Sequence, residues 1–194
     1  MSELRRQAET LRRLGYPDAD VGPLEDAAAS LEATAEGLPF VLVVRGVAPA
    51  AAIAGVELAG KPGFTTMEPD DLARFRPLDG LEPPDGAYLL AGLDAGAATL
   101  NVTPDDALPA IEREGRSPLT LDEGLALVTH FPEVLRTHNC FSLLGSRCGD
   151  RRVTAIWVSE RRPRLGWCWA GNPHTWLGSA SCGARITSRA AARV

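Results

Sequence analysis

Apolar residues recur at helical spacing in two stretches at the start of the chain. Residues 2–15 carry leucine or alanine at every third or fourth position, with charged residues between them, and Gly15 follows as a helix stop. A second, alanine-rich stretch, Leu24–Glu36, ends at Gly37 in the same way. The pattern predicts two helices that form a helical N-terminal extension over residues 1–37, ahead of a main body over residues 38–194.

The middle of the chain combines strand-like runs with helix-start signals. Pro39–Val44 is a continuous apolar run rich in β-branched residues, which is typical of a central strand, and Ala87–Leu93 is the next strand candidate. Thr103, followed by proline and two aspartates, predicts the start of a helix. Thr120–Glu123 is a capping box, and the apolar positions after it predict a helix with one apolar face. Shorter elements are predicted at Ala48–Leu58, Lys61–Met67 and Pro69–Phe75.

From Phe141 onward the pattern changes to the alternation that is typical of strands. Two tight turns join three such runs, which predicts a three-stranded antiparallel meander over Phe141–Arg147, Val153–Ser159 and Leu165–Ala170. Helices gather early and paired strands late. We therefore expect an α+β fold in which N-terminal helices pack on a mixed sheet that ends in a C-terminal antiparallel meander. The length fits a single α+β domain over residues 1–194.

Composition narrows the class of protein. Hydrophobic residues make up 45% of the chain, near the globular average, and no apolar run approaches the roughly 18 residues of a membrane-spanning helix. The N-terminal segment lacks the apolar core of a secretory signal. Four cysteines at irregular spacing are typical of reduced thiols in a cytosolic protein. We therefore expect a cytoplasmic protein that does not enter a membrane.

Charge divides the chain into two chemically different parts. Residues 1–135 contain 10 Lys and Arg against 23 Asp and Glu, whereas residues 136–194 contain 10 Arg against only Asp150 and Glu160. All four tryptophans and all four cysteines lie in the second, basic part. Either the acidic part packs on the basic part and neutralises it, or the basic, tryptophan-rich part meets an anion. The overall charge of −5 disfavours nucleic acid as that anion.

Two catalytic motifs are incomplete. Gly55–Lys61 matches the first seven places of a phosphate-binding P-loop, but Pro62 stands where that loop needs Ser or Thr. The stretch Gly178–Gly183 has no serine with glycine two places before and two places after it, so it is not a nucleophile elbow. We reject both motifs.

Thiol and metal chemistry stay open as alternatives. His174 could activate Cys182 or Ser181 across a loop, because such pairs are defined by geometry and not by sequence order, or the thiol could simply be buried and inert. In the meander, a turn over residues 160–164 would place Cys168 opposite Ile156 and about 14 Å from Cys140, too far for one zinc ion. No CxxC or HExxH spacing is present among the side chains considered, and we assign none of them as a metal ligand: His138, Cys140, Cys148, Cys168, His174 and Cys182.

The tail Trp167–Arg185 is the most unusual stretch. Trp167 and Trp169 alternate onto one sheet face, and the loop after them is built from small and polar residues whose N–H groups and hydroxyls can donate to an anion. The alternative is that the tryptophans fill the core and the loop only turns the chain. The candidate ligand-binding residues are Asn172, His174, Trp176, Ser179 and Arg185.

Several segments of the main body, from about Leu38 onward, resemble one protein family. They are PFVLVV, GKPGF, DLARFRPL, NVTPDDALP, SPLTLDEGLALVTHFPEVL, CFSLLGSRCGDRRV and LGWCWAGNPHTWLGSASC, of which the last two are long and specific. They resemble an actinobacterial family of uncharacterised proteins, the domain of unknown function DUF5701. The resemblance implies a cytoplasmic bacterial protein, and it brings no catalytic role and no cofactor with it.

The residues lead to one hypothesis: a domain that binds a small anionic molecule at the GNPHTWLGS loop. Arg185 would supply charge, and Asn172 and Ser179 would orient the ligand. Trp176 would form an apolar wall, and His174 would act as an acid or base.

Two alternatives remain, and the oligomeric state is open. One is a cysteine- or metal-dependent enzyme that uses the same loop. The other is a protein- or nucleic-acid-interaction module that uses Arg161, Arg162 and Arg164. Metal content would favour the first alternative, steep salt dependence of nucleic-acid binding the second, and thermal stabilisation by small anions the ligand-binding hypothesis.

Overall fold

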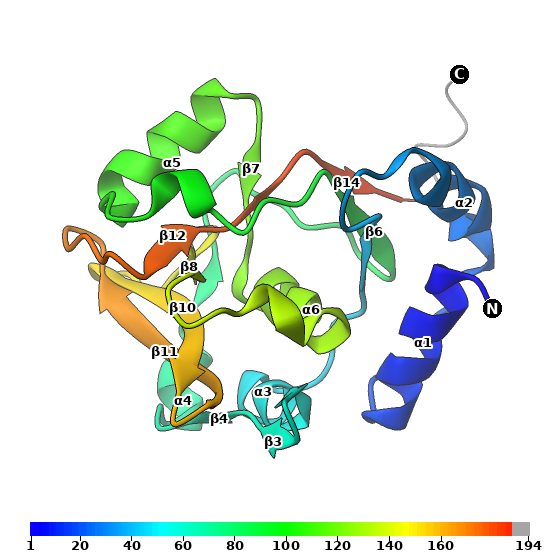
Figure 1. Cartoon of the computed structure of the whole chain (residues 1–194), viewed down its shortest axis with the longest axis horizontal. Coiled ribbons are helices and arrows are strands. Elements are labelled where there is room, and N and C mark those ends of the chain that lie inside the picture. The colour runs from blue at the N-terminus through cyan, green and yellow to red at the C-terminus, as the bar shows by residue number, and fades with distance from the viewer. Residues whose placement is uncertain (188–194) are drawn as a thin grey trace.

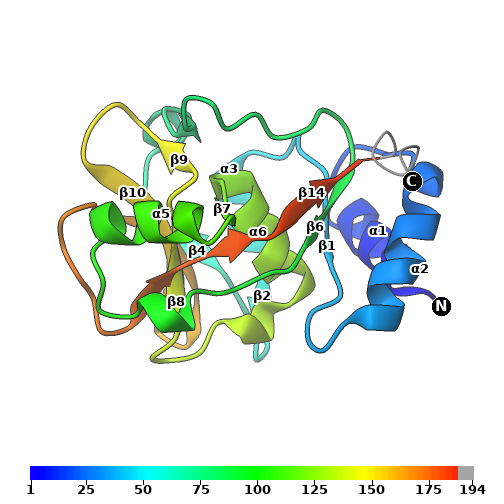
Figure 2. The ribbon, with the colours of Figure 1, turned by 90° about the horizontal axis from the view of Figure 1, so that it is seen from above.

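Two β-sheets lie on opposite sides of helix α6 (Leu121–His130) in this computed structural model, which describes residues 1–187 (Figures 1 and 2). One sheet has the strand order β1-β6-β14, and the other has the order β12-β8-β10-β11-β4. Three further pairs of short strands are β13-β7, β2-β3 and β5-β9. The predicted α+β class, with helices at the N-terminal end and paired strands at the C-terminal end, is confirmed.

The elements are short and alternate along the chain. The helices and 3₁₀ turns are α1 (Glu3–Arg13), η1 (Gly22–Leu24), α2 (Glu25–Thr34), α3 (Pro49–Gly55), α4 (Pro69–Leu72), η2 (Ala97–Thr99), α5 (Pro104–Arg113), α6 and η3 (Pro132–Val134). The strands are β1 (Val41–Val43), β2 (Glu57–Leu58), β3 (Lys61–Pro62), β4 (Phe64–Thr65), β5 (Arg76–Pro77), β6 (Tyr88–Ala91), β7 (Ser117–Pro118), β8 (Cys140–Leu143), β9 (Ser146–Arg147), β10 (Arg152–Ser159), β11 (Arg162–Trp169), β12 (Leu177–Ser179), β13 (Ser181–Cys182) and β14 (Ala184–Ile186). None of the helices in this described part is long and apolar enough to cross a bilayer.

The two predicted N-terminal helices are confirmed, and they cover the outer face of the three-stranded sheet. The side chain of Ser2 caps α1 by accepting the N–H of Arg5. The apolar stripe of α1, which includes Leu4 and Leu11, joins Leu42 of β1 in one buried cluster that also contains residues of α2 and β6. Figure 2 shows α1 and α2 together on the side of β1 and β6 that faces away from α6. The extension is therefore attached through apolar burial on this sheet.

The Pro39–Val44 run forms β1, but the prediction of a central strand is wrong: within residues 1–187, β1 is an outer strand that pairs only with β6. Buried side chains bond its free edge. The Gln7 amide accepts the N–H of Leu42 at 2.6 Å and donates to Phe40 O at 3.0 Å, and His130 Nε2 lies 2.9 Å from Leu42 O. A run that is apolar throughout shows burial of both faces of a strand, and it carries no information about which edges are paired.

Helix α6 begins at the predicted capping box but is buried on more than one face. The Thr120 hydroxyl accepts the N–H of Glu123, and the Glu123 carboxylate accepts the N–H of Thr120. Because α6 lies between the two sheets, Ala126 and Leu127 are buried as well as the predicted apolar stripe. Gly124 lets α6 pack directly on Leu143 of β8, because a Cβ at position 124 would overlap the Leu143 side chain.

The predicted meander is confirmed as β8, β10 and β11, and the parallel neighbours β12 and β4 make its sheet mixed. The turn between β10 and β11 is shorter than predicted. It contains only Glu160 and Arg161, both at positive φ (55° and 62°), so Cys168 lies opposite Val153 and the predicted register is wrong. The Phe141–Arg147 run is also divided, because β9 leaves the sheet to pair with β5.

Candidate functional site

The predicted ligand-binding loop GNPHTWLGS, residues 171–179, is a loop only over residues 171–176, which connects β11 to β12 at one end of the five-stranded sheet (Figure 1); its last three residues form β12. Backbone hydrogen bonds hold both of its ends: the N–H of Asn172 donates to Trp169 O at 3.1 Å, and Cys140 N donates to Trp176 O at 3.0 Å. In between, the N–H of Asn101 donates to His174 O at 2.9 Å. Asn172 is exposed, whereas His174 and Trp176 are half-buried. The loop is thus fixed to the sheet and keeps its polar tip in solvent.

The side chains of His174 and Trp176 begin a row that crosses one face of the five-stranded sheet. Their ring centroids lie 5.3 Å apart, and Trp176 meets Trp157 of β10 edge to face at 5.8 Å. Trp157 lies on Gly166 of β11, where a Cβ would overlap the indole ring. The Trp157 indole can lie on the sheet at this point because position 166 has no side chain.

Arginine side chains continue the row toward the far edge of the sheet. The guanidinium carbon of Arg164 lies 5.3 Å from the ring centroid of Trp157 and 5.5 Å from that of Phe64 in β4. Arg162 follows, 4.5 Å from the Phe64 centroid. We call these six half-buried side chains the aromatic–arginine row: His174, Trp176, Trp157, Arg164, Phe64 and Arg162.

Arg164 is bonded at only part of its guanidinium group. Its Nη2 donates to Thr66 Oγ1 at 3.1 Å. Its Nε is buried and has no hydrogen-bond partner among residues 1–187. A buried N–H without an acceptor costs free energy, so Arg164 is held in the row at an energetic cost.

A basic hollow of about 510 Å³ opens where the row ends. It is lined by the β10–β11 turn and the β2–β3 hairpin, with Lys61, Arg161 and Arg162 as its cations and Glu160 as its one carboxylate. Arg162 Nε donates to Pro62 O at 2.8 Å and fixes one hairpin against the other. Lys61 is the only lysine of the chain. Three cations at one open hollow create a positive potential at this end of the row.

The structure does not bring Arg185 to the loop. Its guanidinium group binds the fully buried carboxylate of Glu123 through two donors, Nε at 2.6 Å and Nη2 at 2.7 Å. Further donors bond Ser117 Oγ at 2.6 Å and Pro118 O at 3.1 Å. Burial opposes the charged form of Arg185, but Glu123 outweighs it and raises the pKa of the guanidinium group. Arg185 therefore fastens β14 to the start of α6.

The polar residues Tyr88 and Ser179 are also hydrogen-bonded inside the protein. Tyr88 of β6 donates its hydroxyl to the same carboxylate at 2.9 Å, and burial together with the Glu123 charge raises the pKa of Tyr88. Ser179 is buried in β12, where its N–H donates to Thr99 Oγ1 at 2.8 Å. Of the five predicted ligand residues, Asn172, His174 and Trp176 lie in one loop, and the other two lie in the interior.

The four cysteines are free and buried. Burial raises the pKa of each thiol, and that of Cys182 reaches about 11, so the nucleophilic thiolate is disfavoured. Over the described residues 1–187, no three His, Cys, Asp or Glu side chains gather closely enough to hold a metal ion. The thiol and metal alternatives therefore have no supporting geometry in this part of the chain.

The sequence prediction missed how differently the four tryptophans are placed. Trp157 and Trp176 belong to the aromatic–arginine row, whereas Trp167 and Trp169 lie on the opposite face of the sheet, 37% and 47% exposed. The alternation of positions 157, 167 and 169 along paired strands signals two faces, but assigning them needed the register.

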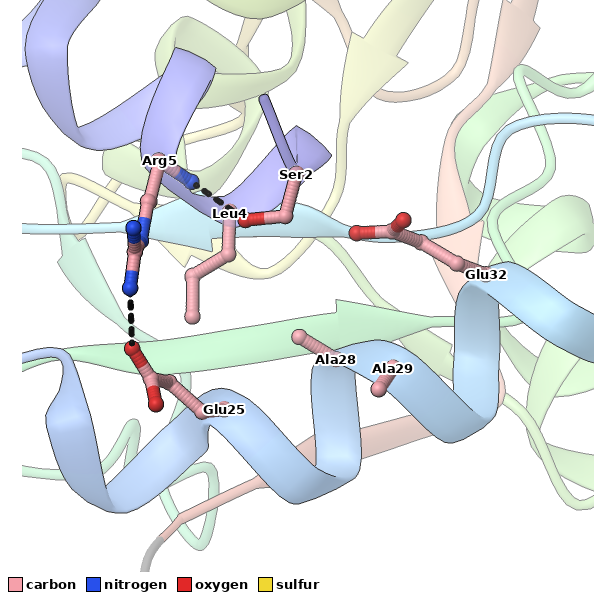
Figure 3. Close-up of a pocket in the computed structure, with 7 residues that line it drawn as sticks. All are labelled: Ser2, Leu4, Arg5, Glu25, Ala28, Ala29 and Glu32. Carbon is pink, nitrogen blue, oxygen red and sulfur yellow. Dashed lines mark hydrogen bonds and ion pairs between the residues drawn. The ribbon is translucent and has the colours of Figure 1, made fainter.

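The N-terminal helices enclose a separate hollow of about 300 Å³ (Figure 3). Figure 3 shows Ala28 and Ala29 of α2 beneath Leu4 of α1, and one ion pair, Arg5 to Glu25 at 3.5 Å, closes one end. Both charged side chains of this pair are more than half exposed, so the pair contributes little. We assign no ligand to this hollow.

The fold and the row together define an α+β protein with a half-buried aromatic and basic surface on one sheet. A protein-family model described as a family of unknown function, DUF5701, matches residues 7–188. The chain belongs to this family, as the resembling segments predicted, and the match also includes most of α1 and all of α2. No curated protein and no solved structure matches the chain.

Proposed function

We propose that this chain binds a small anionic molecule that carries a flat apolar group, on the sheet face that bears the aromatic–arginine row. The continuity of the row carries the proposal, because it joins the loop residues His174 and Trp176 to the basic hollow at Lys61 and Arg161. Aromatic rings stack on flat groups, and guanidinium and ammonium groups attract anions.

In this proposal the loop and the hollow have different tasks. Trp176 and His174 contact the flat group, and the exposed Asn172 amide at the tip of the loop orients it. The charge that the sequence assigned to Arg185 comes from the basic hollow, because the donors of Arg185 are bonded within the interior.

Arg164 supports the assignment from the middle of the row. Its unbonded Nε is the one donor of the row that the described residues leave both buried and without an acceptor. The Arg164 side chain is only half-buried, so a carboxylate or phosphoryl oxygen above the row would be attracted to its guanidinium charge. Binding in the cytoplasm is part of the proposal and is supported by the four free thiols, which suit a reducing compartment.

The test is calorimetric titration and thermal unfolding with three probes: phenyl phosphate, inorganic phosphate and phenol. We expect phenyl phosphate to bind most tightly and to raise Tm most, because only it offers both a ring and an anion. Trp176→Leu and Arg162→Gln should each weaken phenyl phosphate binding by about tenfold.

Matched controls remove the same side chains elsewhere. Trp169→Leu on the opposite face and Arg5→Gln on α1 should bind phenyl phosphate like the wild type. Equal affinity in all four variants, or no binding of any probe by the wild type, would overturn the proposal. Binding of an oligothymidylate with steep salt dependence, and no binding of phenyl phosphate, would favour the nucleic-acid alternative.

A further inference from the structure

Half of β11 lies open at the margin of the molecule (Figure 1). On its inner side, β11 pairs with β10 along its whole length. On its outer side, β4 pairs only with Arg164 and Leu165. Within residues 1–187, no strand pairs with Gly166–Trp169 on this outer side, so a four-residue strand edge faces outward.

The backbone groups at this edge belong to the two exposed tryptophans. Ala170 N donates to Arg151 O at 2.8 Å, and bonded and non-bonded pairs alternate along antiparallel strands. Gly166 and Cys168 therefore direct their N–H and C=O groups toward β10, whereas Trp167 and Trp169 direct theirs outward. The N–H of Asn172 already donates to Trp169 O, which confirms the outward direction and leaves that oxygen a second lone pair.

This edge lacks three of the features with which proteins usually block strand addition. Gly166–Trp169 contains no charged residue, no proline and no bulge. The edge of β1 is blocked, because the buried Gln7 amide bonds its free groups. The side chains of Trp167 and Trp169 also leave apolar surface exposed beside the open edge, and interfaces are enriched in tryptophan.

The charges beside the tryptophans are balanced. Arg152 binds Asp71 through two donors, at 2.6 and 2.9 Å, and lies 5.5 Å from the Trp167 ring centroid. Arg151 pairs with Asp105 at 3.2 Å. A surface on which each arginine has an aspartate does not repel a copy of itself, whereas a partner of strong single charge gains nothing from it.

We propose that this edge pairs with the same edge of a second copy of this chain, antiparallel and about a two-fold axis that passes beside Cys168. In this register Trp167 of each copy lies opposite Trp169 of the other. Each of these two pairs exchanges two N–H···O bonds, so every free donor and acceptor of the edge is used. Registers centred on Trp167 or on Trp169 use only one such pair, because the next residues are already bonded to β4 or belong to the loop.

The same register brings the exposed tryptophans together. Residues opposite each other in an antiparallel pair project to the same face, so the four indoles of the dimer would lie side by side and cover one another. The contact is isologous and closed, so it yields a dimer and not a fibre. It lies on the face opposite the aromatic–arginine row, and it is independent of the proposed ligand.

The test is the mass of the full chain in solution, measured by sedimentation or light scattering over a range of concentrations. We expect a concentration-dependent dimer at twice the chain mass of 20.6 kDa. Trp169→Ser and Trp167→Lys should each weaken the dimer by about tenfold or more. Trp176→Leu, which removes a tryptophan of the row, should leave the dimer constant unchanged.

Hydrogen exchange on the unmodified protein keeps the proposal falsifiable even where a variant fails to fold. The amides of Trp167 and Trp169 should exchange slowly at high protein concentration and become fast on dilution, while those of Gly166 and Cys168 stay protected by β10 throughout. A monomer at all concentrations with fast exchange at Trp167 and Trp169, or a dimer that both substitutions leave intact, would overturn the self-pairing. Slow exchange in a monomer only after addition of an extended peptide would assign the edge to another chain and would also overturn it.

Discussion

The free edges of the outer strands β1 and β11 differ in whether other groups of the protein bond them. The free edge of β1 lies in the interior, and its backbone groups are bonded by Gln7 and His130 from two helices. The free edge of β11 lies at the surface and is formed by the backbone of the two exposed tryptophans. A buried strand edge must find partners inside the molecule, whereas a surface edge can leave them to solvent or to another chain.

The same contrast separates the arginines of the two sheets. Arg185, in β14 of the three-stranded sheet, has a side chain that is 12% exposed, and its guanidinium group donates to Glu123, Ser117 and Pro118. Arg164, on the five-stranded sheet, has a donor without a partner in the described part of the chain. Arg185 therefore stabilises the fold, whereas Arg164 keeps one donor that no group of residues 1–187 bonds. Four predictions test this division.

The largest effect is expected at Arg185. Arg185→Leu leaves the Glu123 carboxylate buried without its cation, which should lower the free energy of unfolding by about 4 kcal/mol in urea denaturation. Adding Glu123→Gln in the same chain should restore part of the loss, because the unpaired charge is then gone. Stability equal to the wild type in Arg185→Leu would place Arg185 outside the structural network and return it to the ligand hypothesis.

A slightly smaller loss of unfolding free energy is expected when the hydrogen bonds of Gln7 to the edge of β1 are removed. Gln7→Met keeps the volume but removes the bonds to Leu42 N and Phe40 O, which should cost about 3 to 4 kcal/mol of unfolding free energy. The control is Glu9→Met on the exposed side of the same helix, which should change stability by less than about 0.5 kcal/mol. If both variants unfold at the same urea concentration, Gln7 does not close the edge.

The other side chain at that edge makes stability depend on pH. Burial, with a smaller contribution from Arg6, lowers the pKa of His130 from 6.5 to about 4, and its Nδ1 has no partner among residues 1–187. Between about pH 6.5 and pH 4, the unfolded chain therefore binds a proton at His130 that the folded chain does not bind. The stability that neutral His130 provides is complete above about pH 6.5 and is lost as the pH falls to about 4, by about 3 kcal/mol.

His130→Gln isolates this contribution. The variant keeps a side-chain N–H that can donate to Leu42 O but cannot titrate, so its unfolding free energy should change less between pH 6.5 and 4 than that of the wild type. Parallel pH profiles for the two proteins would show that His130 does not sense acid.

The smallest effect on stability is expected at the open edge. Trp169→Ser removes a side chain that is 47% exposed and packs edge to face on Trp167, and it should cost about 1 kcal/mol of monomer stability. Trp157→Ser removes an indole that lies on Gly166 and meets Trp176, and it should cost about 2 kcal/mol or more. A larger loss at Trp169 than at Trp157 in dilute monomer would reverse the division between the two tryptophan pairs.

Local patterns predicted most of the elements. The helix that starts at Thr120 and the β10–β11 hairpin were both found, because capping residues and strand alternation act over a few neighbouring positions. The predicted register of that hairpin was wrong because its turn is shorter than predicted. Two residues in the left-handed region, Glu160 and Arg161, close it, and neither is of the residue types that usually signal such a turn.

For the candidate site, the sequence identified the loop but not its partners. Asn172, His174 and Trp176 were grouped because they are close in the chain, and they lie in one loop; Arg185 was added for the same reason. β12, β13 and β14 pair with three different strands, however, and carry Arg185 away from the loop to Glu123. Phe64, which is far away in the chain, reaches the row through the parallel pairing of β4 with β11, and Lys61 reaches the hollow through the β2–β3 hairpin that Arg162 bonds.

The sequence by itself therefore determined the α+β class, the helix starts, the meander and the membership of the family. Only the tertiary structure decided which strand edges are closed, which arginines are already bonded and which tryptophans face solvent. The reason is physical: propensity, capping and alternation depend on neighbouring residues. Burial and hydrogen bonding of a side chain depend on every element packed around it, and these come from all parts of the chain.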